Sequence, residues 1–290
     1  MTVHMLLADI PSPTVSYIHV GPFTIRFYAI IMMMATWIAV TIIYQRWKRR
    51  GGTFDQITDI AVVAIPCGLI GARLYNCLTV PFNYFPYYGG SLINILKIWD
   101  GGMAIFGALI GGYCGAALMC HRKHLSLLSF SDAAAPALLV AQSFGRLGNW
   151  FNQELYGTPT TLPWGLKLNQ SNAIGEYELC YNNTPCPNPE THVFQPTFLY
   201  SIIWCMLGVL VLLLIEKKYH ASLHAGQTFA IYLMWYGIGR AAIEHIRINA
   251  SLYIGPFRIN TLVALIVFVL GLILFIKLKT NKHHQAKVTQ

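Results

Sequence analysis

The sequence has few charged residues. Only 11% of its 290 residues are Asp, Glu, Lys or Arg, whereas soluble domains carry about a quarter. Hydrophobic residues make up 55% of the chain, which is more apolar sequence than a soluble core of this length would need. The composition therefore predicts a polytopic membrane protein.

The sequence also lacks the common short motifs of soluble enzymes. It shows no glycine-rich phosphate loop, no zinc-ligand spacing, no low-complexity tract and no convincing internal repeat. Residues 1–20 lack a basic start followed by an apolar run, so we expect no cleavable signal peptide. We also expect no metal ion and no cofactor.

Seven apolar stretches are long enough, at about 20 residues each, to cross the hydrocarbon core of a bilayer. They predict an all-α integral membrane protein with seven transmembrane helices. An odd number of spans puts the two ends of the chain on opposite sides of the membrane. The predicted spans lie near residues 24–45, 57–79, 99–120, 132–151, 198–216, 226–246 and 259–278.

Lys and Arg are distributed unequally between the two sets of loops. The segments that follow the first, third, fifth and seventh spans hold twelve of them, and the other set holds five. The positive-inside rule then predicts a periplasmic N-terminus and a cytoplasmic C-terminus. Because this topology signal accounts for most of the net charge of +9, we expect no nucleic-acid partner.

The predicted outer side carries the longer connections. Residues 152–197 form the longest loop, for which we predict a small periplasmic cap on a single membrane domain covering residues 1–290. The loop holds Cys180 and Cys186, and two close cysteines in an oxidising compartment are either a disulfide or idle thiols. The other five cysteines fall in or beside spans, where they are interpreted as small apolar residues.

The segment 145–157 places polar residues where the fourth span reaches the outer surface. It contains Arg146, Asn149, Asn152 and Glu154. Ionisable groups at membrane depth cost roughly 2.5–3.5 kcal/mol each on insertion scales, so they usually pair, bind a ligand or react. Polar groups confined to the outer half favour a site at the lipid headgroups over a proton relay or an ion channel, which would distribute them through the full depth.

The sixth span carries a second polar set on one helix face. At 100° per residue, Tyr236, Arg240, Glu244 and Arg247 fall within about 80° of one another. His245 falls on the opposite face and is interpreted as an interfacial residue. The stripe is either a structural Arg–Glu pair or part of a site. With the arginine of the fourth span nearby, positive charge would remain uncompensated, and a lipid phosphate is the obvious anion at this depth.

These residues resemble the signature of a known family. The segment from Gly145 to Gly157 is similar to the pattern G-R-x-G-N-F-x-N-x-E-x-x-G of the prolipoprotein diacylglyceryl transferases, which are bacterial inner-membrane enzymes, with Trp150 in place of the usual Phe. The resemblance extends over almost the whole chain. Further matching elements are Gly21-Pro22 with Ile25-Arg26-Phe27-Tyr28, Gly71-Ala72-Arg73-Leu74-Tyr75, Trp99-Asp100-Gly101-Gly102-Met103, Asp132 with Ala135-Pro136, Gln195-Pro196-Thr197-Phe198-Leu199-Tyr200, and Tyr236-Gly237 with Arg240, Glu244 and Arg247.

Four positions depart from the family pattern. Phe106 stands where the family often has a histidine, so a mechanism with a histidine base at that position cannot operate here. Gln195 replaces a usual histidine, Ser201 a usual glutamate and Ala29 a common glycine. Two alternatives to an active enzyme stay open: a catalytically weakened paralogue that binds anionic lipid or lipoprotein precursors, and a membrane transporter, for which repeat symmetry and broken helices would be expected.

The resemblance implies a reaction and its partners. The diacylglyceryl group of phosphatidylglycerol would be transferred to the lipobox cysteine of a preprolipoprotein signal peptide, with release of glycerol 1-phosphate. The enzyme would be a multi-pass protein of the bacterial inner membrane with its active site toward the periplasmic leaflet. Its partners would be phosphatidylglycerol, the signal peptide and the lipid bilayer.

This chemistry assigns roles to the polar residues. We expect Arg146 and Arg240 to bind the phosphate and stabilise its leaving charge. Glu154 is expected to accept the thiol proton or to position Arg146, and Asn149 completes the expected catalytic set. The residues expected to bind phosphatidylglycerol are Arg146, Arg240, Tyr28, Asn149, Asn152, Glu244, Tyr236 and Gly157.

Overall fold

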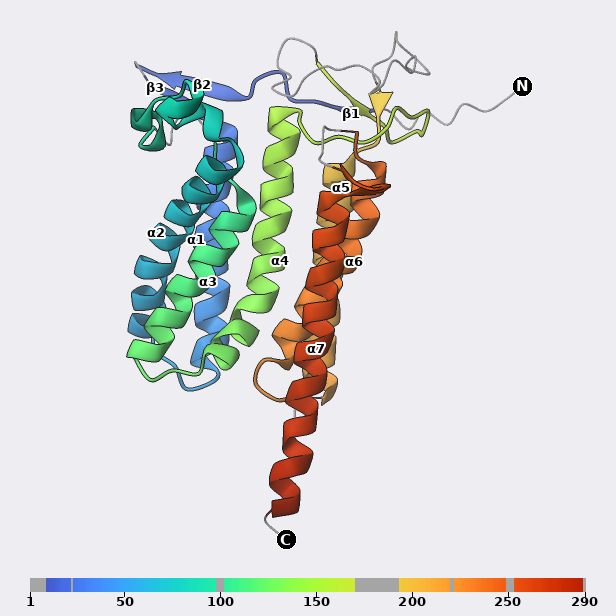
Figure 1. Cartoon of the computed structure of the whole chain (residues 1–290). Helices are drawn as coiled ribbons and strands as arrows, with labels where there is room; N and C mark the ends of the chain where they lie inside the picture. The colour runs from blue at the N-terminus through green and yellow to red at the C-terminus, as the bar shows by residue number, and fades with distance from the viewer. Residues whose placement is uncertain are drawn as a thin grey trace, which may run out of the picture. The chain divides into compact units, whose positions relative to one another are not determined.

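The computed structural model describes residues 9–21, 23–97, 102–169, 193–219, 222–248 and 253–288. In this part of the chain there are seven α-helices, shown in Figure 1. Five of them are long and apolar enough to cross a membrane. These are α1 (Phe27–Lys48), α2 (Phe54–Thr79), α4 (Leu127–Asn152), α5 (Thr197–Tyr219) and α7 (Ile259–Val288), in which the apolar part is Ile259–Thr280. The expected all-α membrane architecture is therefore confirmed.

The other two helices are α3 (Ile105–Arg122) and α6 (Gln227–Ile246). They coincide with the third and sixth predicted spans but do not meet the same criterion of length and apolar composition. The helix α6 carries Arg240 and Glu244 within its length, which lowers its hydropathy. What the structure supports directly is thus a multi-pass helical membrane protein with five candidate spans.

Two predicted spans begin several residues before their helices. The first predicted span begins near residue 24, but Phe23–Arg26 is strand β3, which pairs antiparallel with β2 (Tyr17–Val20). The turn of this hairpin contains Gly21 at a φ of 59°, a conformation that favours glycine. The third span was placed from residue 99, whereas α3 begins at Ile105. The helical hydropathy pattern could not reveal the strand before α1 or the later start of α3.

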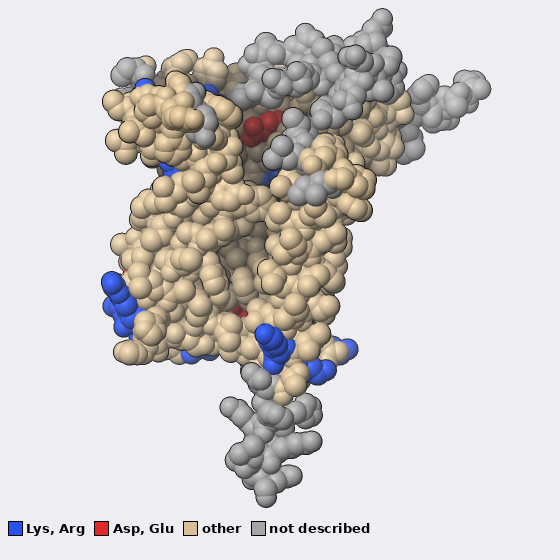
Figure 2. All heavy atoms as spheres, viewed as in Figure 1, with Lys and Arg blue, Asp and Glu red and all other residues tan. Residues whose placement is uncertain are grey.

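The chain forms two compact units, which are described separately. The larger unit contains residues 1–39 and 134–290, and the smaller one contains residues 40–133. In the view of Figure 2, the helical flank of each unit shows almost only uncharged side chains, and Lys and Arg appear toward the helix ends. This distribution fits helices whose sides face hydrocarbon.

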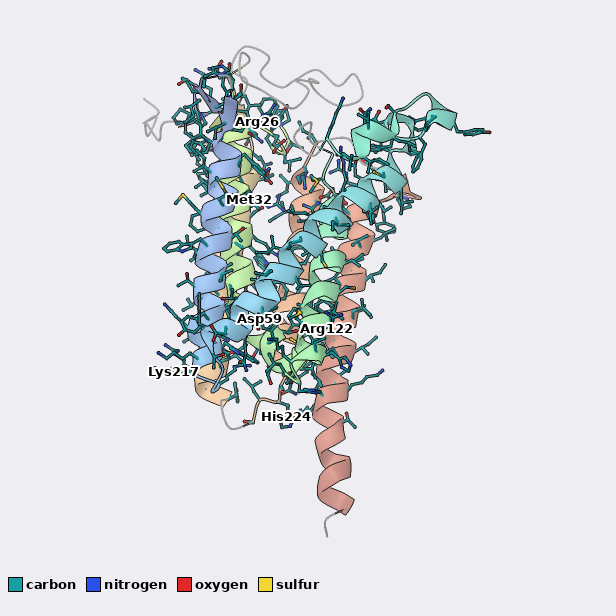
Figure 3. All side chains as sticks on the ribbon, turned by 90° about the vertical axis from the view of Figure 1, so that its left-hand side faces the viewer. Arg26, Met32, Asp59, Arg122, Lys217 and His224 are labelled. Carbon is teal, nitrogen blue, oxygen red and sulfur yellow. The ribbon has the colours of Figure 1, made fainter. Side chains whose placement is uncertain are left out.

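In the smaller unit, α2 and α3 pack with their backbones in close contact. A Cβ atom added to Gly71 would lie 2.4 Å from the carbonyl oxygen of Gly107, and one added to Gly107 would lie 2.1 Å from that of Gly71. Small residues at helix interfaces are the usual means of such close approach in membranes. Figure 3 shows Asp59 and Arg122 near the same end of this helix pair, where Lys123 forms a 2.6 Å ion pair with Asp59.

In the smaller unit, Arg73 on α2 binds the segment that follows this helix. Its side chain is buried, and it donates four hydrogen bonds to main-chain oxygens: Nε to Ile95 (2.9 Å), Nη1 to Gly102 (3.1 Å), and Nη2 to Lys97 (2.8 Å) and Asn94. The segment itself consists of the short 3-10 helices η1 (Pro81–Asn83), η2 (Pro86–Tyr88) and η3 (Leu92–Ile95). Arg73 is thus a structural cation that satisfies carbonyl groups outside regular helix.

A proline within α4 is compensated by arginine. Pro136 has no N–H, so the carbonyl oxygen of Asp132 lacks its usual helical donor. Arg46 supplies one: its Nη2 donates to Asp132 O at 3.1 Å, and its Nε donates to Ala133 O at 3.0 Å. Arg50 also lies 3.7 Å from the Asp132 carboxylate. The helix therefore continues through the proline from Leu127 to Asn152.

In the larger unit, α6 contacts both α5 and α7. Figure 3 shows Arg26, before α1, and Lys217, near the end of α5, at opposite ends of this unit. Beyond the helix ends, β1 (Ile10–Pro11), β4 (Leu166–Lys167) and β5 (Val193–Phe194) form a three-stranded sheet. A hairpin of β6 (Tyr253–Ile254) and β7 (Phe257–Arg258) joins α6 to α7. Cys180 and Cys186, the two cysteines of the predicted cap, lie outside the described residues.

Candidate functional site

Glu244 is the centre of an arginine cluster in the larger unit. Its side chain is fully buried, and Asn260 Nδ2 donates to its Oε1 at 2.9 Å. Three arginines lie within ion-pair distance of its carboxylate oxygens: Arg240 at 3.0 Å, Arg247 at 3.4 Å and Arg258 at 3.5 Å. One buried carboxylate therefore holds three guanidinium groups together, which leaves an excess of positive charge.

The end of α6 explains how these groups meet. Arg240 and Glu244 are one helical turn apart, and the helix ends at Ile246, so Arg247 has an extended backbone. Arg258 returns on the hairpin, where its Nη1 donates to the carbonyl oxygens of Glu244 (3.0 Å) and Arg247 (2.7 Å). It thereby satisfies carbonyls that a helix C-terminus leaves without donors.

Arg247 is a cation outside the helical segment. Burial, and then the neighbouring Arg240 cation, lower the pKa of Arg247 to about 9, while Glu244 acts in the opposite direction. The guanidinium therefore remains protonated at neutral pH. It can contribute a full positive charge to a ligand.

A second polar network forms at the end of α4. Asn149 Nδ2 donates to Glu154 Oε1 at 2.8 Å, and Asn152 Nδ2 donates to the same oxygen at 3.2 Å. Arg146 Nη1 lies 3.4 Å from Asn149 Oδ1. The predicted residues Arg146, Asn149, Asn152 and Glu154 are therefore brought together, with Asn149 between the arginine and the carboxylate. Asn152 was expected past the helix end but is the last residue of α4.

Glu154 sits in an unusual turn. The residues on either side of it, Gln153 and Leu155, have positive φ angles of 53° and 59°, which cost roughly 1–2 kcal/mol each for residues with a side chain. The fully buried Gln153 amide stabilises the turn, because its Nε2 donates to Pro13 O (3.1 Å) and its Oε1 accepts from Asn169 N (2.7 Å). Thr197 Oγ1 donates to Leu155 O at 2.5 Å.

Sequence reasoning missed Gln153 and Thr197. Gln153 gave no signal of its own beyond being a polar residue among other polar residues of segment 145–157. Thr197 matched the family pattern but received no role. Both residues act by fixing the backbone around Glu154 rather than by offering a charged group. Their importance is visible only in the contacts between segments that are far apart in the sequence.

Gly157 connects the two polar networks. Its N–H donates to Gln195 O at 2.9 Å, and the next residue, Thr158, donates to Ile246 O at 2.9 Å. Gly157 also forms an isolated β-bridge with Arg247. An added Cβ would lie 2.9 Å from side-chain atoms of Gln195 and Ile246, so only glycine lets the chain pass here without displacement.

Tyr28 and Tyr236 border the networks from different helices. The ring of Tyr28 on α1 covers Gly148, where an added Cβ would lie 2.5 Å from Tyr28 Cδ2. The Tyr236 ring on α6 stacks against Tyr232, with ring centroids 6.3 Å apart.

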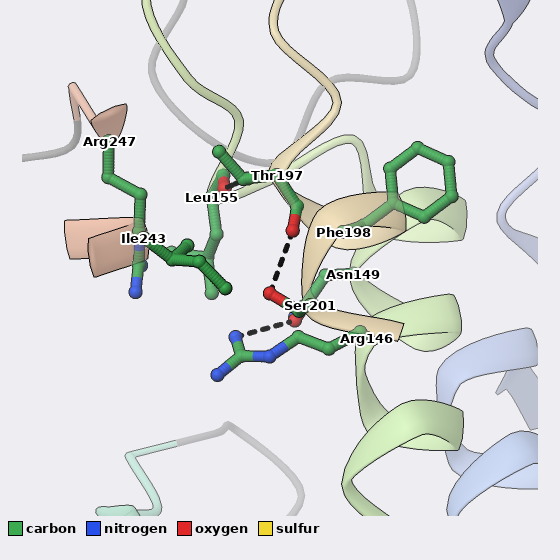
Figure 4. Close-up of a pocket in the computed structure, with 8 residues that line it drawn as sticks. All are labelled: Arg146, Asn149, Leu155, Thr197, Phe198, Ser201, Ile243 and Arg247. Carbon is green, nitrogen blue, oxygen red and sulfur yellow. Dashed lines mark hydrogen bonds between the residues drawn. The ribbon is translucent and has the colours of Figure 1, made fainter. Parts of the chain in front are cut away.

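Two pockets meet at Arg146. The first is shown in Figure 4 and includes Arg146, Asn149 and Arg247 in its lining. The second includes Arg146, Arg240 and Tyr236. Both pockets share Arg146, Ser201 and Ile243. In Figure 4, Ser201 lies beside Arg146, and its hydroxyl donates to Thr197 O at 2.7 Å.

Asn152 Oδ1, an acceptor, and Arg247 Nε, a donor, are buried and have no hydrogen-bond partner among the described residues. Buried polar groups are paired in the great majority of cases, so an exception calls for an explanation. A ligand that carries both a hydroxyl donor and an anionic acceptor would satisfy the two atoms.

The positions that depart from the family pattern have different surroundings. Phe106 belongs to the smaller unit, where its ring packs against Tyr75 with centroids 6.2 Å apart. Gln195 Nε2 donates to Thr158 Oγ1 at 3.0 Å, so it supports the segment of Gly157. His245 is exposed, as the helical wheel predicts. Among the described residues, no three His, Cys, Asp or Glu side chains are placed to hold a metal ion.

The apolar helices and the pockets lined by arginines define a multi-pass α-helical membrane protein with a cluster of cationic side chains in its larger unit. The family model for prolipoprotein diacylglyceryl transferase matches residues 15–277. The chain therefore belongs to the prolipoprotein diacylglyceryl transferase family, and the resemblance identified from its motifs is confirmed.

Several relatives are similar over most of their length. The chain is 56% identical over 274 residues to the phosphatidylglycerol–prolipoprotein diacylglyceryl transferase of Bifidobacterium longum (strain DJO10A), which covers 94% of this chain and 87% of that protein. The proteins of the same name from Bifidobacterium adolescentis and Mycobacteroides abscessus are 48% and 39% identical over 273 and 264 residues. These matches cover 94% and 91% of this chain, and 80% and 76% of the relatives.

Proposed function

We propose that this chain is a transferase that moves the diacylglyceryl group of phosphatidylglycerol to the cysteine thiol of a prolipoprotein. The observation that carries this proposal is the pair of pockets joined at Arg146, with Arg240 in one and Arg247 in the other. The relatives are named for the same substrates. The specific acceptor that we propose is the lipobox cysteine of the signal peptide.

The lipid phosphate is the group that the arginines would hold. Arg146 and Arg240 line the same pocket, and guanidinium groups bind phosphate oxygens through paired charge-assisted hydrogen bonds. Positioned cations stabilise charge that develops on a leaving group, typically by 10²–10³-fold in rate per donor. Glu244 orients Arg240 through their 3.0 Å ion pair and so fixes the phosphate-binding geometry.

The reaction exchanges one bond at carbon and releases one proton. The sulfur forms a thioether bond with the carbon of the diacylglyceryl group that carries the phosphate, the bond from this carbon to the phosphate oxygen breaks, and its electron pair leaves with glycerol 1-phosphate. A free thiol has a pKa of about 8.5, so it is mostly protonated at neutral pH. It must lose this proton to become the reactive thiolate. We assign this proton to Glu154, which two asparagine amides hold at its Oε1.

The remaining site residues would bind and orient the lipid. Asn152 Oδ1 is a buried acceptor without a partner among the described residues, and a glycerol hydroxyl is a suitable donor. Asn149 would hold both Arg146 and Glu154 in place through its amide. Tyr28 covers Gly148 beside the same network, and Tyr236 lines the second pocket. Gly157 has no side chain, so the segment after Glu154 can lie directly beside Arg247.

The same proposal includes the arrangement in the membrane. We take all seven helices as spans of one membrane domain, residues 1–290, because 18 residues in α3 and 20 in α6 extend about 27 and 30 Å. The bias of Lys and Arg supports a periplasmic N-terminus and a cytoplasmic C-terminus. Residues 152–197 would then form a periplasmic cap, and the site would face the periplasmic leaflet of the bacterial inner membrane.

Reconstitution tests the proposed activity. The purified protein is mixed with phosphatidylglycerol vesicles and a lipobox peptide, and the diacylglyceryl peptide and glycerol 1-phosphate are measured by mass spectrometry. We expect equimolar formation of both products and none with a peptide in which serine replaces the cysteine. Lipid and peptide binding without either product would instead support a non-catalytic, lipid-binding paralogue.

Phe106→His tests whether the missing histidine has weakened the enzyme. Phe106 packs against Tyr75 in the smaller unit, and an imidazole can occupy the place of a phenyl ring. If Glu154 is the base, the variant should insert into the membrane and transfer at the rate of the parent protein. A large increase in rate would show that the natural chain is a weakened paralogue.

A further inference from the structure

The charge of the site exceeds what its substrate needs. The two networks contain four guanidinium groups and two carboxylates, which leaves a formal excess of two positive charges among the described residues. A phosphodiester such as the phosphatidylglycerol headgroup carries one negative charge. The charged groups of the two networks are Arg146, Arg240, Arg247, Arg258, Glu154 and Glu244.

The excess charge is concentrated beside the pockets. Arg146 has no carboxylate within ion-pair distance among the described residues, and its guanidinium contacts the neutral amide of Asn149. Arg247 lines the first pocket, and its buried Nε–H has no acceptor there among the described residues. Glu244 is shared by three arginines, so its single charge cannot neutralise them.

The product fits this charge better than the substrate does. Breaking the carbon–oxygen bond turns the phosphodiester into a phosphomonoester, which carries about −1.5 to −2 at pH 7 because its second pKa is about 6. Buried opposite charges attract more strongly than exposed ones, since less water screens them. Groups that bind the charge formed in the reaction more strongly than the starting charge accelerate the chemical step.

We propose that the arginine pockets are selective for phosphomonoester dianions, so that glycerol 1-phosphate remains bound after transfer and inhibits the next turnover. The identity of the retained product rests on the proposed function, whereas the preference for a dianion rests on the site charge alone. The shared pocket residue Ser201 gives a way to alter that charge, because its buried side chain lines both pockets beside Arg146.

The first experiment uses the unmodified protein in detergent or nanodiscs. Binding of glycerol 1-phosphate, and of glycerophosphoglycerol as a diester with one charge, is measured by calorimetry at pH values from 5.5 to 7.5. We expect the monoester to bind about tenfold more tightly than the diester at pH 7.5. Its affinity should rise with pH through about 6, where the second proton leaves, and the diester should show no such rise. Equal affinities, or equal pH profiles, would overturn the proposal.

Two matched variants test the origin of the preference. Ser201→Glu adds one carboxylate beside Arg146, and Ser201→Gln adds a side chain of nearly the same size without charge. We expect the monoester-to-diester ratio to fall several-fold in Ser201→Glu and to stay high in Ser201→Gln. A ratio that falls equally in both would assign the effect to size and contradict a role of charge.

Turnover measurements separate this inference from the proposed function. In the lipidation reaction, glycerol 1-phosphate should inhibit more strongly than glycerophosphoglycerol. An active enzyme that the monoester does not inhibit would overturn product retention and leave the transferase activity intact. A protein without transfer activity that still binds monoesters about tenfold more tightly would contradict the proposed function and support the dianion preference.

Discussion

Trp204 and Trp235 exchange a pair of hydrogen bonds. Trp204 Nε1 donates to Trp235 O at 3.1 Å, and Trp235 Nε1 donates to Trp204 O at 3.0 Å. Their rings stack at 4.4 Å between centroids, with 19° between the planes. Each indole covers a glycine of the other helix, so a Cβ on Gly208 or Gly239 would lie 2.4 or 2.0 Å from the indole nitrogen. This contact between Trp204 and Trp235, here called the clasp, holds α5 and α6 together next to Arg240.

The clasp has a spectroscopic signature. Stacked indoles couple their electronic transitions, so the parent protein should show a couplet in circular dichroism at the indole absorption bands. Trp235→Phe should remove the couplet and destabilise the protein by about 1–2 kcal/mol, since one hydrogen bond and part of the stacking are lost. The control is Trp37→Phe on α1, where the side chain is 72% exposed. Persistence of the couplet in Trp235→Phe would contradict the stacked geometry.

Arg146→Ala should reduce lipidation by about 10²–10³-fold, because it removes a positioned cation from the leaving phosphate. Arg146→Lys should recover only part of the rate, since an ammonium group cannot form the planar paired bonds of guanidinium. Rates are measured with the lipobox peptide after membrane insertion is verified. Arg122→Ala is the control, because Arg122 is exposed at the end of α3. Substantial activity in Arg146→Ala would refute the assignment of the phosphate to Arg146.

Glu154→Gln tests the proton acceptor. The amide keeps an oxygen for Asn149 and Asn152 but cannot accept the thiol proton at neutral pH. We expect the rate at pH 7 to fall by about 10²–10⁴-fold and to recover in part as the pH rises toward 8.5, where the thiol ionises in solution. The matched control is Glu216→Gln, which makes the same change in the last turn of α5. If the pH–rate profile of Glu154→Gln keeps the parent shape, Glu154 only positions its neighbours.

Gln153 separates the contribution of backbone strain from that of the buried amide. Gln153→Ala removes both side-chain hydrogen bonds and keeps the strained φ, so it should destabilise the protein by about 2–4 kcal/mol. Gln153→Gly loses the same bonds but tolerates the positive φ, and it should be about 1 kcal/mol more stable than the alanine variant. Thermal unfolding in detergent gives both values. Equal stabilities of the two variants would show that residue 153 is not left-handed.

The sequence predicted the parts of the site that depend on local periodicity. Arg240 and Glu244 share a face because a helix repeats every 3.6 residues, and Arg146 and Asn149 follow the same rule on α4. Arg258 was counted only as a loop charge, although it pairs with Glu244 and completes the end of α6. Its partner lies 14 residues away across a hairpin, and periodicity holds no information about such a contact.

The boundaries and supports of the site followed from tertiary contacts instead. The hairpin of β2 and β3 delays the start of α1, and the turn around Glu154 depends on bonds from Gln153 to main-chain groups of Pro13 and Asn169. Hydropathy measures the preference of a segment for lipid, so it locates helices well but not the strands that precede them. The family resemblance supplied the names of the reacting groups, whereas their connections became visible only in the structure.

The bonds from Arg46 to α4 affect how the topology of this protein should be mapped. Orientation is commonly tested by moving positive charges from one loop to another and following a reporter fusion. Removing Arg46 would change the positive charge at this end of α1 and would also remove the hydrogen bond from its Nη2 to the Asp132 carbonyl, which Pro136 cannot replace. A failed insertion could then be mistaken for an inverted one. Lys48 and Arg49 are exposed, so they are the charges to relocate.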